Sequence, residues 1–139
     1  MATTTIAGYS GTPLARKLGI AAGARIAVID APPEYADWVD PLPDRAQVVA
    51  YPEPRAALVH LFVTRREILA ERLAEFRSTL GREVAIWVSW PKKASKQPTT
   101  VTEDVIRELA LPLGLVDIKV CAVSEVWSGL KLVLRKELR

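Results

Sequence analysis

The sequence predicts an α/β fold, and three observations lead to that conclusion. An apolar run at residues 25–29 has no polar face, which indicates a strand buried on both sides, as in a parallel sheet. Residues 64–80 have the apolar spacing of a surface helix. Residues 115–123 and 130–135 alternate apolar with polar side chains, which is typical of an antiparallel pair at a sheet edge. These patterns predict a single three-layer, Rossmann-like domain whose mostly parallel sheet, of about five or six strands, is closed by a C-terminal antiparallel edge hairpin.

The chain is expected to begin with a loop and a short helix. Thr12 is a suitable N-cap, Pro13 suits the first helical position, and Gly19 can end the helix. After the strand at residues 25–29, we expect one helical turn at residues 33–38.

The middle of the chain is predicted to hold two strands and the most regular helix. Residues 47–51 and 58–63 are the expected strands. Thr64 and Glu67 have the spacing of a capping box, which would open the helix, and Gly81 would stop it. The apolar face of this helix consists of Leu69, Leu73, Phe76 and Leu80.

The next predicted strand, residues 84–88, leads into a polar and basic loop over residues 89–100. A second capping box, at Thr100 and Glu103, is expected to open another helix. Pro112 cannot continue that helix, because its ring would clash with the preceding turn.

Composition limits the class of protein. Half of the 139 residues are apolar and a quarter are charged, so residues 1–139 can bury one core as a single domain and are not a disordered chain. No stretch approaches the roughly 18 apolar residues of a membrane span, and residues 1–9 lack the pattern of a secretion signal. A single cysteine, Cys121, suits a reducing cytoplasm, and one cysteine with one histidine disfavours a zinc site.

The net charge of +3 comes from small basic spots on a neutral body. One spot lies in residues 131–139 and the other consists of Lys92, Lys93 and Lys96. A protein that binds duplex nucleic acid usually presents a broader basic stripe, so nucleic-acid binding is disfavoured.

The candidate site with the most chemistry is the loop over residues 89–96. It would leave the carboxyl end of a central parallel strand, where open α/β sheets bind ligands, and it precedes a helix N-terminus, which favours anions. The candidate ligand residues there are Ser89, Trp90, Lys92, Lys93, Ser95 and Lys96. The alternative is a solvated loop whose lysines keep the protein soluble and whose Trp90 covers the core.

Four other residues have two interpretations each. Asp30 ends the first strand, where it would either meet a ligand or cap the following turn. Trp127 would either line the same pocket as Trp90 or pack on the end of the sheet. Gly129 indicates a bulge or a close approach of backbone. For His60, a place in the core is favoured over a ligand role.

No usual nucleotide loop is found. Residues 8–12 resemble a glycine loop only weakly, because no strand precedes them. Prolines follow the strand at residues 25–29, where a dinucleotide fold needs glycines for close backbone approach, so NAD or ATP binding in that loop is disfavoured. No catalytic set of residues can be assembled from the sequence.

Three segments, residues 8–15, 87–93 and 127–133, resemble a bacterial family of unknown function, the domain-of-unknown-function family numbered 3052. The resemblance covers nearly the whole chain. It implies a cytoplasmic bacterial protein but no catalytic residue. Some relatives lack the double lysine, which favours Lys92 over Lys93 as a ligand residue.

These observations favour a module that binds a small anionic ligand, such as a nucleotide or a phosphorylated metabolite, with no cofactor assigned. The rival hypothesis is a protein-interaction or regulatory module that uses the hairpin at residues 115–135, as in a homodimer. A methyltransferase-like enzyme ranks lower, because the late strand–helix–hairpin order fits that fold but the glycine loop for the methyl donor is missing.

Overall fold

The structure is a computed structural model, and it describes residues 12–53 and 55–139. Its helices and strands follow one another in the order expected for an α/β domain. They are α1 (Leu14–Leu18), β1 (Arg25–Ile29), α2 (Tyr35–Trp38), β2 (Gln47–Val49), β3 (Leu58–Phe62), α3 (Arg66–Thr79), β4 (Ala85–Pro91), α4 (Glu103–Ala110), β5 (Leu115–Ala122) and β6 (Trp127–Leu134). Three short 3-10 helices are η1 (Lys93–Ser95), η2 (Leu111–Leu113) and η3 (Lys136–Leu138).

The strands form one six-stranded sheet in the order β2-β1-β3-β4-β6-β5. The first four strands along the chain pair in parallel, whereas β6 is antiparallel to both β4 and β5. The predicted fold class is therefore confirmed. From β1 the chain goes to β2 on one side, and β3 lies on the other side, so the strand order reverses between β1 and β3.

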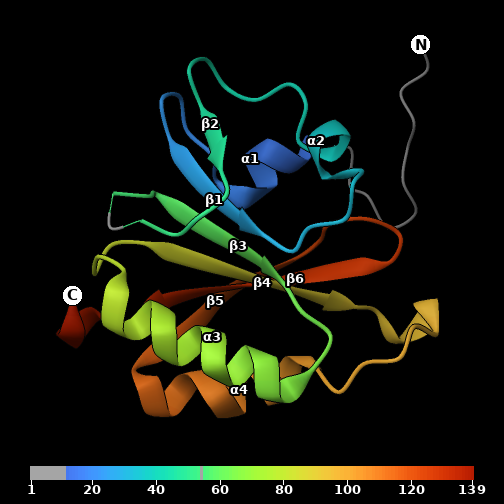
Figure 1. The fold of residues 1–139 in the computed structure, drawn as a ribbon, viewed down its shortest axis with the longest axis vertical. Coiled ribbons are helices and arrows are strands. Elements are labelled where there is room, and N and C mark those ends of the chain that lie inside the picture. The colour runs from blue at the N-terminus through green and yellow to red at the C-terminus, as the bar shows by residue number, and fades with distance from the viewer. Residues whose placement is uncertain (1–11, 54) are drawn as a thin grey trace.

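Helices cover both faces of the sheet, which gives three layers (Figure 1). On one face α3 and α4 pack, and Leu69, Leu73 and Ile106 are fully buried beneath them. On the other face α1 and α2 pack, with Leu14 and Tyr35 in the buried cluster. Because both faces are covered, all five residues of β3 and all seven of β4 are buried, as the uninterrupted apolar runs predicted.

Strand β4 is longer than predicted. Ser89, Trp90 and Pro91 were assigned to the basic loop, but they continue the strand because they pair with β6, Ser89 with Gly129 and Pro91 with Trp127. Pairing with β6 extends β4 beyond the apolar run at residues 84–88. The predicted loop therefore starts at Lys92.

Both capping boxes are wrong, because the caps come from other residues. Helix α3 begins after Arg65 with no side-chain cap of its own, and the backbone N–H of Arg66 donates to Thr100 Oγ1 at 2.7 Å. In α4 the cap is Thr102, whose hydroxyl accepts from the backbone N–H of Val105 at 3.2 Å. Thr100 thus stabilises the start of a helix that lies 34 residues away in sequence.

The local predictions at the N-terminal side are confirmed in part. The helical turn after β1 is present as α2, and Gly19 ends α1 with a left-handed φ of 81°. Thr12 does not cap α1, whose N-cap position is Pro13. The predicted strand at residues 47–51 stops at Val49. The weak glycine loop at residues 8–11 lies outside the described residues.

Candidate functional site

The carboxyl ends of β1 and β3 meet at the point where the strand order reverses. Open α/β sheets bind ligands at this point. Asp30 follows β1 with a left-handed φ of 59°, and its carboxylate lies 3.6 Å from the guanidinium of Arg72 on α3. A cavity of about 250 Å³ opens here, which we name the switch cavity. Its lining consists of Asp30, Phe62, Val63, Thr64, Arg65, Ile68 and Trp127.

A second, larger cavity of about 470 Å³ is also lined by Trp127 and lies between α2 and the turn that joins β5 to β6. We name it the edge cavity. Its lining consists of Pro32, Glu34, Trp38, Gln97, Ser124, Glu125, Val126 and Trp127. Trp127 belongs to both linings, so one residue contributes to the walls of the two cavities.

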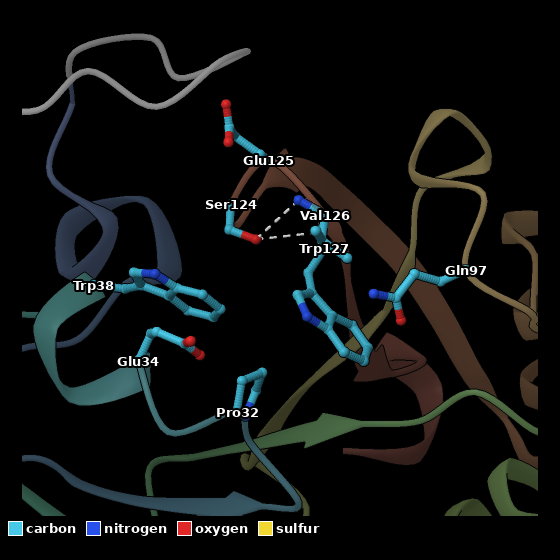
Figure 2. A pocket seen from close by; sticks show the side chains of 8 residues that line it. All are labelled: Pro32, Glu34, Trp38, Gln97, Ser124, Glu125, Val126 and Trp127. Atoms are coloured by element: carbon cyan, nitrogen blue, oxygen red, sulfur yellow. Dashed lines mark hydrogen bonds between the residues drawn. The ribbon is translucent and has the colours of Figure 1, made fainter.

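Figure 2 shows Trp38 and Trp127 on opposite sides of the edge cavity, with Glu34 beside Trp38 and Glu125 at the rim. Within residues 12–53 and 55–139, neither glutamate has an ion-pair partner. None of the eight described lining residues is basic. The edge cavity is therefore acidic and aromatic.

Ser124 holds the turn that carries Trp127. Its side chain is buried, and its hydroxyl accepts from the backbone N–H groups of Val126 and Trp127 at 3.2 and 3.1 Å. The backbone N–H of Val123 also donates to the carbonyl of Trp127 at 2.9 Å. These bonds fix the backbone from which the indole projects.

The ring of Phe62 packs against both indoles. Its ring centroid lies 5.1 Å from that of Trp127, in an edge-to-face arrangement, and 6.4 Å from that of Trp38. It also stacks on His60 at 4.5 Å. The two walls of the edge cavity thus rest on one buried ring, which sets their separation.

A buried polar network anchors α2 to the sheet. The Tyr35 hydroxyl hydrogen-bonds with His60 Nδ1 at 2.9 Å, and His60 Nε2 hydrogen-bonds with Ser89 Oγ at 2.7 Å. Burial lowers the pKa of His60 to about 3 and raises the pKa of Tyr35. The imidazole is therefore neutral, and the network holds Tyr35 next to the cavity residue Glu34. His60 has the core position that the sequence favoured.

The structure places two predicted site residues, Asp30 and Trp127, at the cavities, and it separates them from the others. Ser89 is buried in the His60 network, and Trp90 is buried in the core beneath α3 and α4. Trp90 and Trp127 therefore do not share a pocket. The Cβ of an alanine at Gly129 would meet Trp87 at 3.2 Å, so this glycine serves a close approach, as predicted.

The predicted lysines do not line either cavity, although the backbone N–H of Lys92 donates to the carbonyl of the lining residue Val126 at 2.7 Å. Lys92, Lys93 and Lys96 belong to neither lining, and Lys93 starts the short helix η1. Ser95 Oγ donates to the carbonyl of Lys92 at 2.7 Å, so it stabilises this turn. A ligand role for these four residues stays a prediction.

The sequence patterns did not point to four polar or aromatic residues of the edge cavity: Glu34, Trp38, Gln97 and Glu125. One signal was available for two of them. The helical turn after β1 carries an acidic residue and a tryptophan directly after a strand's carboxyl end, where a ligand is expected.

Solved structures with the same fold are mostly described as methyltransferases. A SAM-dependent methyltransferase from Aquifex aeolicus is 11% identical, with a TM-score of 0.61, over 84% of this chain and 85% of that one. The O-methyltransferase NcsB1 of neocarzinostatin biosynthesis, solved with S-adenosylmethionine, is 17% identical, with a TM-score of 0.63, over 92% of this chain and 53% of that one. The Bacillus subtilis tRNA methyltransferase TrmK is 10% identical, with a TM-score of 0.55, over 87% of this chain and 63% of that one.

These likenesses correct the ranking of functions. The sequence favoured an anion-binding module, with an interaction module as its rival, and placed a methyltransferase-like enzyme below both. That order is wrong, because several of the solved structures that share the fold are described as methyltransferases. The missing glycine loop, on which the ranking rested, describes one way to hold the donor and does not define the fold.

No protein-family model and no curated protein matches the chain, and the resemblance to family 3052 stays a prediction. In the part of the chain that the structure describes, no helix has the length and apolar character to cross a membrane. The same residues contain no cluster of three or more histidine, cysteine or acidic side chains suited to a metal ion.

Proposed function

We propose that this protein is a methyltransferase-like enzyme whose two substrates meet at Trp127. One observation supports this most: two cavities adjoin at the carboxyl edge of the sheet and share that indole as a wall. Group transfer needs a donor and an acceptor held side by side. The shared fold with S-adenosylmethionine-dependent methyltransferases makes that methyl donor the first candidate.

The switch cavity has side chains of the kinds that such a donor requires. S-adenosylmethionine presents ribose hydroxyls, an amino group, a carboxylate and an adenine ring, and its sulfonium sulfur supplies a methyl group to a nucleophile. The carboxylate of Asp30 can accept from hydroxyl or amino groups, and the guanidinium of Arg65 can pair with a carboxylate. Phe62 and Ile68 offer apolar surface for the ring.

The backbone after β1 differs from the usual donor loop. Glycines normally let the backbone approach the ligand closely there, but this chain has Asp30 in a left-handed conformation followed by Ala31 and Pro32. We therefore expect the donor to be held by side chains and to lie farther from the strand ends. This also predicts weaker binding than a glycine loop provides.

Donor binding is the decisive test, because it does not require knowledge of the acceptor. The full chain is titrated with S-adenosylmethionine by calorimetry. We expect saturable binding that Asp30→Asn weakens about tenfold, since a hydrogen bond to a charged group is lost. The matched control is Asp44→Asn, an exposed aspartate whose carboxylate lies 3.8 Å from Arg45, outside both cavities.

Two results would contradict the proposal. Either no heat of binding is seen with S-adenosylmethionine at millimolar concentration, or Asp30→Asn and Asp44→Asn bind it as well as the unmodified chain. Retained binding with loss in Asp30→Asn alone would support the switch cavity as the donor site.

A further inference from the structure

Two indole side chains belong to the lining of the edge cavity. Trp38 and Trp127 are each half-buried and lie across the cavity from one another (Figure 2). Among aromatic side chains, tryptophan attracts a cation most strongly, because its ring face is electron-rich. Phe62 supports both rings, so their spacing is set before a ligand arrives.

The charge of the cavity has one sign. Glu34 at the N-cap of α2 and Glu125 in the β5–β6 turn approach it from different segments, and both are exposed. Among the described residues neither carboxylate is neutralised by an ion pair, and no lysine or arginine lines the cavity. An anion would be repelled here, and a neutral ligand would gain nothing from the two charges.

We propose that the edge cavity is a binding site for an organic ammonium group, held between Trp38 and Trp127 and balanced by Glu34 and Glu125. Methylated amines fit this combination best, because their diffuse charge is weakly hydrated and their methyl groups pack on indole faces. The cavity is open and about 470 Å³, which admits a small amine or an amine-bearing side chain.

The amine is the methyl acceptor, a role that rests on the proposed function. Trp127 lines both the edge cavity and the switch cavity, which brings the amine close to the donor site. The bound ammonium first gives a proton to the carboxylate of Glu34 or Glu125. The lone pair of the resulting neutral amine then forms the new N–C bond, and the S–C bond breaks with its electron pair remaining on sulfur. The methylated ammonium that results is the species the cavity holds best.

The test compares choline with 3,3-dimethyl-1-butanol, a neutral molecule of the same shape. Binding to the full chain is followed by calorimetry, and by the fluorescence of the tryptophans as a second readout. We expect saturable binding of choline and at least about tenfold weaker binding of the neutral alcohol. Equal binding of the two molecules, or no binding of choline at millimolar concentration, would overturn the proposal.

Variants locate the site. Glu34→Gln and Glu125→Gln should each weaken choline binding about threefold and should reduce its salt dependence. Trp38→Leu keeps apolar bulk but removes the aromatic ring, and should weaken choline binding about three- to tenfold. Glu83→Gln, an exposed carboxylate outside both linings, is the control and should change nothing. Unaltered choline binding in all three cavity variants would place the cation elsewhere and refute the site.

The outcomes separate this inference from the proposed function. Choline binding without S-adenosylmethionine binding keeps the ammonium site and removes the acceptor role. S-adenosylmethionine binding without choline binding keeps the donor and refutes the ammonium site. If both bind, they should bind together. Competition between them would place both in one cavity and would refute the acceptor arrangement.

Discussion

His60 makes the folding stability of this protein depend on pH in a defined direction. It is the one histidine in the chain, and it is completely buried between Tyr35 and Ser89. Burial lowers its pKa from 6.5 to about 3. Between these values the unfolded chain binds a proton that the folded chain does not. Stability is therefore complete above pH 6.5 and falls as the pH is lowered through that value toward 3.

The size of the effect follows from the two pKa values. Well below pH 6.5 the free energy of unfolding falls by about 1.4 kcal/mol per pH unit. From pH 7.5 to pH 5.0 the accumulated loss is about 2 kcal/mol. Most carboxylates titrate below this range, so the slope there belongs chiefly to His60.

Urea denaturation followed by tryptophan fluorescence measures this loss at a series of pH values between 7.5 and 5.0. His60→Asn removes the titrating group, so its stability, though lower throughout, should be nearly flat over the same range. NMR provides a second readout, because the imidazole resonances of the folded protein should not titrate above pH 5. A constant stability in the unmodified chain, or an equal slope in His60→Asn, would refute the argument.

Three further stability predictions can be checked by urea denaturation. Gly129→Ala should lower the free energy of unfolding by about 1–3 kcal/mol, because the new Cβ would lie 3.1 Å from the side chain of Val123 and 3.2 Å from that of Trp87. An unchanged stability would mean that these side chains can move aside. Thr100→Ala should cost about 1 kcal/mol by removing the cap of α3, whereas Thr64→Ala should cost little; the reverse order would restore the capping box. Trp87→Phe should cost about 1–3 kcal/mol, because the buried indole N–H donates to the Leu18 carbonyl at 2.9 Å; an unchanged midpoint would show that this bond contributes nothing.

Most of the fold could be predicted because it depends on local patterns. Apolar runs without a polar face, as at residues 25–29 and 58–62, occur where helices cover both sides of a sheet. The alternation in β5 correctly predicted an edge strand, but its apolar residues do not mark a buried face, because Ile118 and Val120 are more than half exposed. Period and polarity together thus separate the parallel strands from the hairpin.

What failed depends on contacts between distant segments. Ser89 and Trp90 belong to β4 because β6 pairs with them, and no pattern near residue 90 signals that pairing. The cap of α3 is Thr100, whose hydroxyl accepts a hydrogen bond from the backbone N–H of Arg66, 34 residues away in sequence. The edge cavity likewise brings together α2 and a turn that lies about 90 residues later in the chain. The predicted cytoplasmic location and homodimer stay predictions.

Trp127 lines two cavities and its ring packs against Phe62, which also packs against Trp38. A ligand that rotates or orders this ring on one side therefore changes the wall presented on the other. Such communication is thermodynamically reciprocal: whatever factor the first ligand applies to the affinity of the second is returned by the second to the first. Trp127 is thereby the residue through which occupancy of one cavity would be cooperative with occupancy of the other.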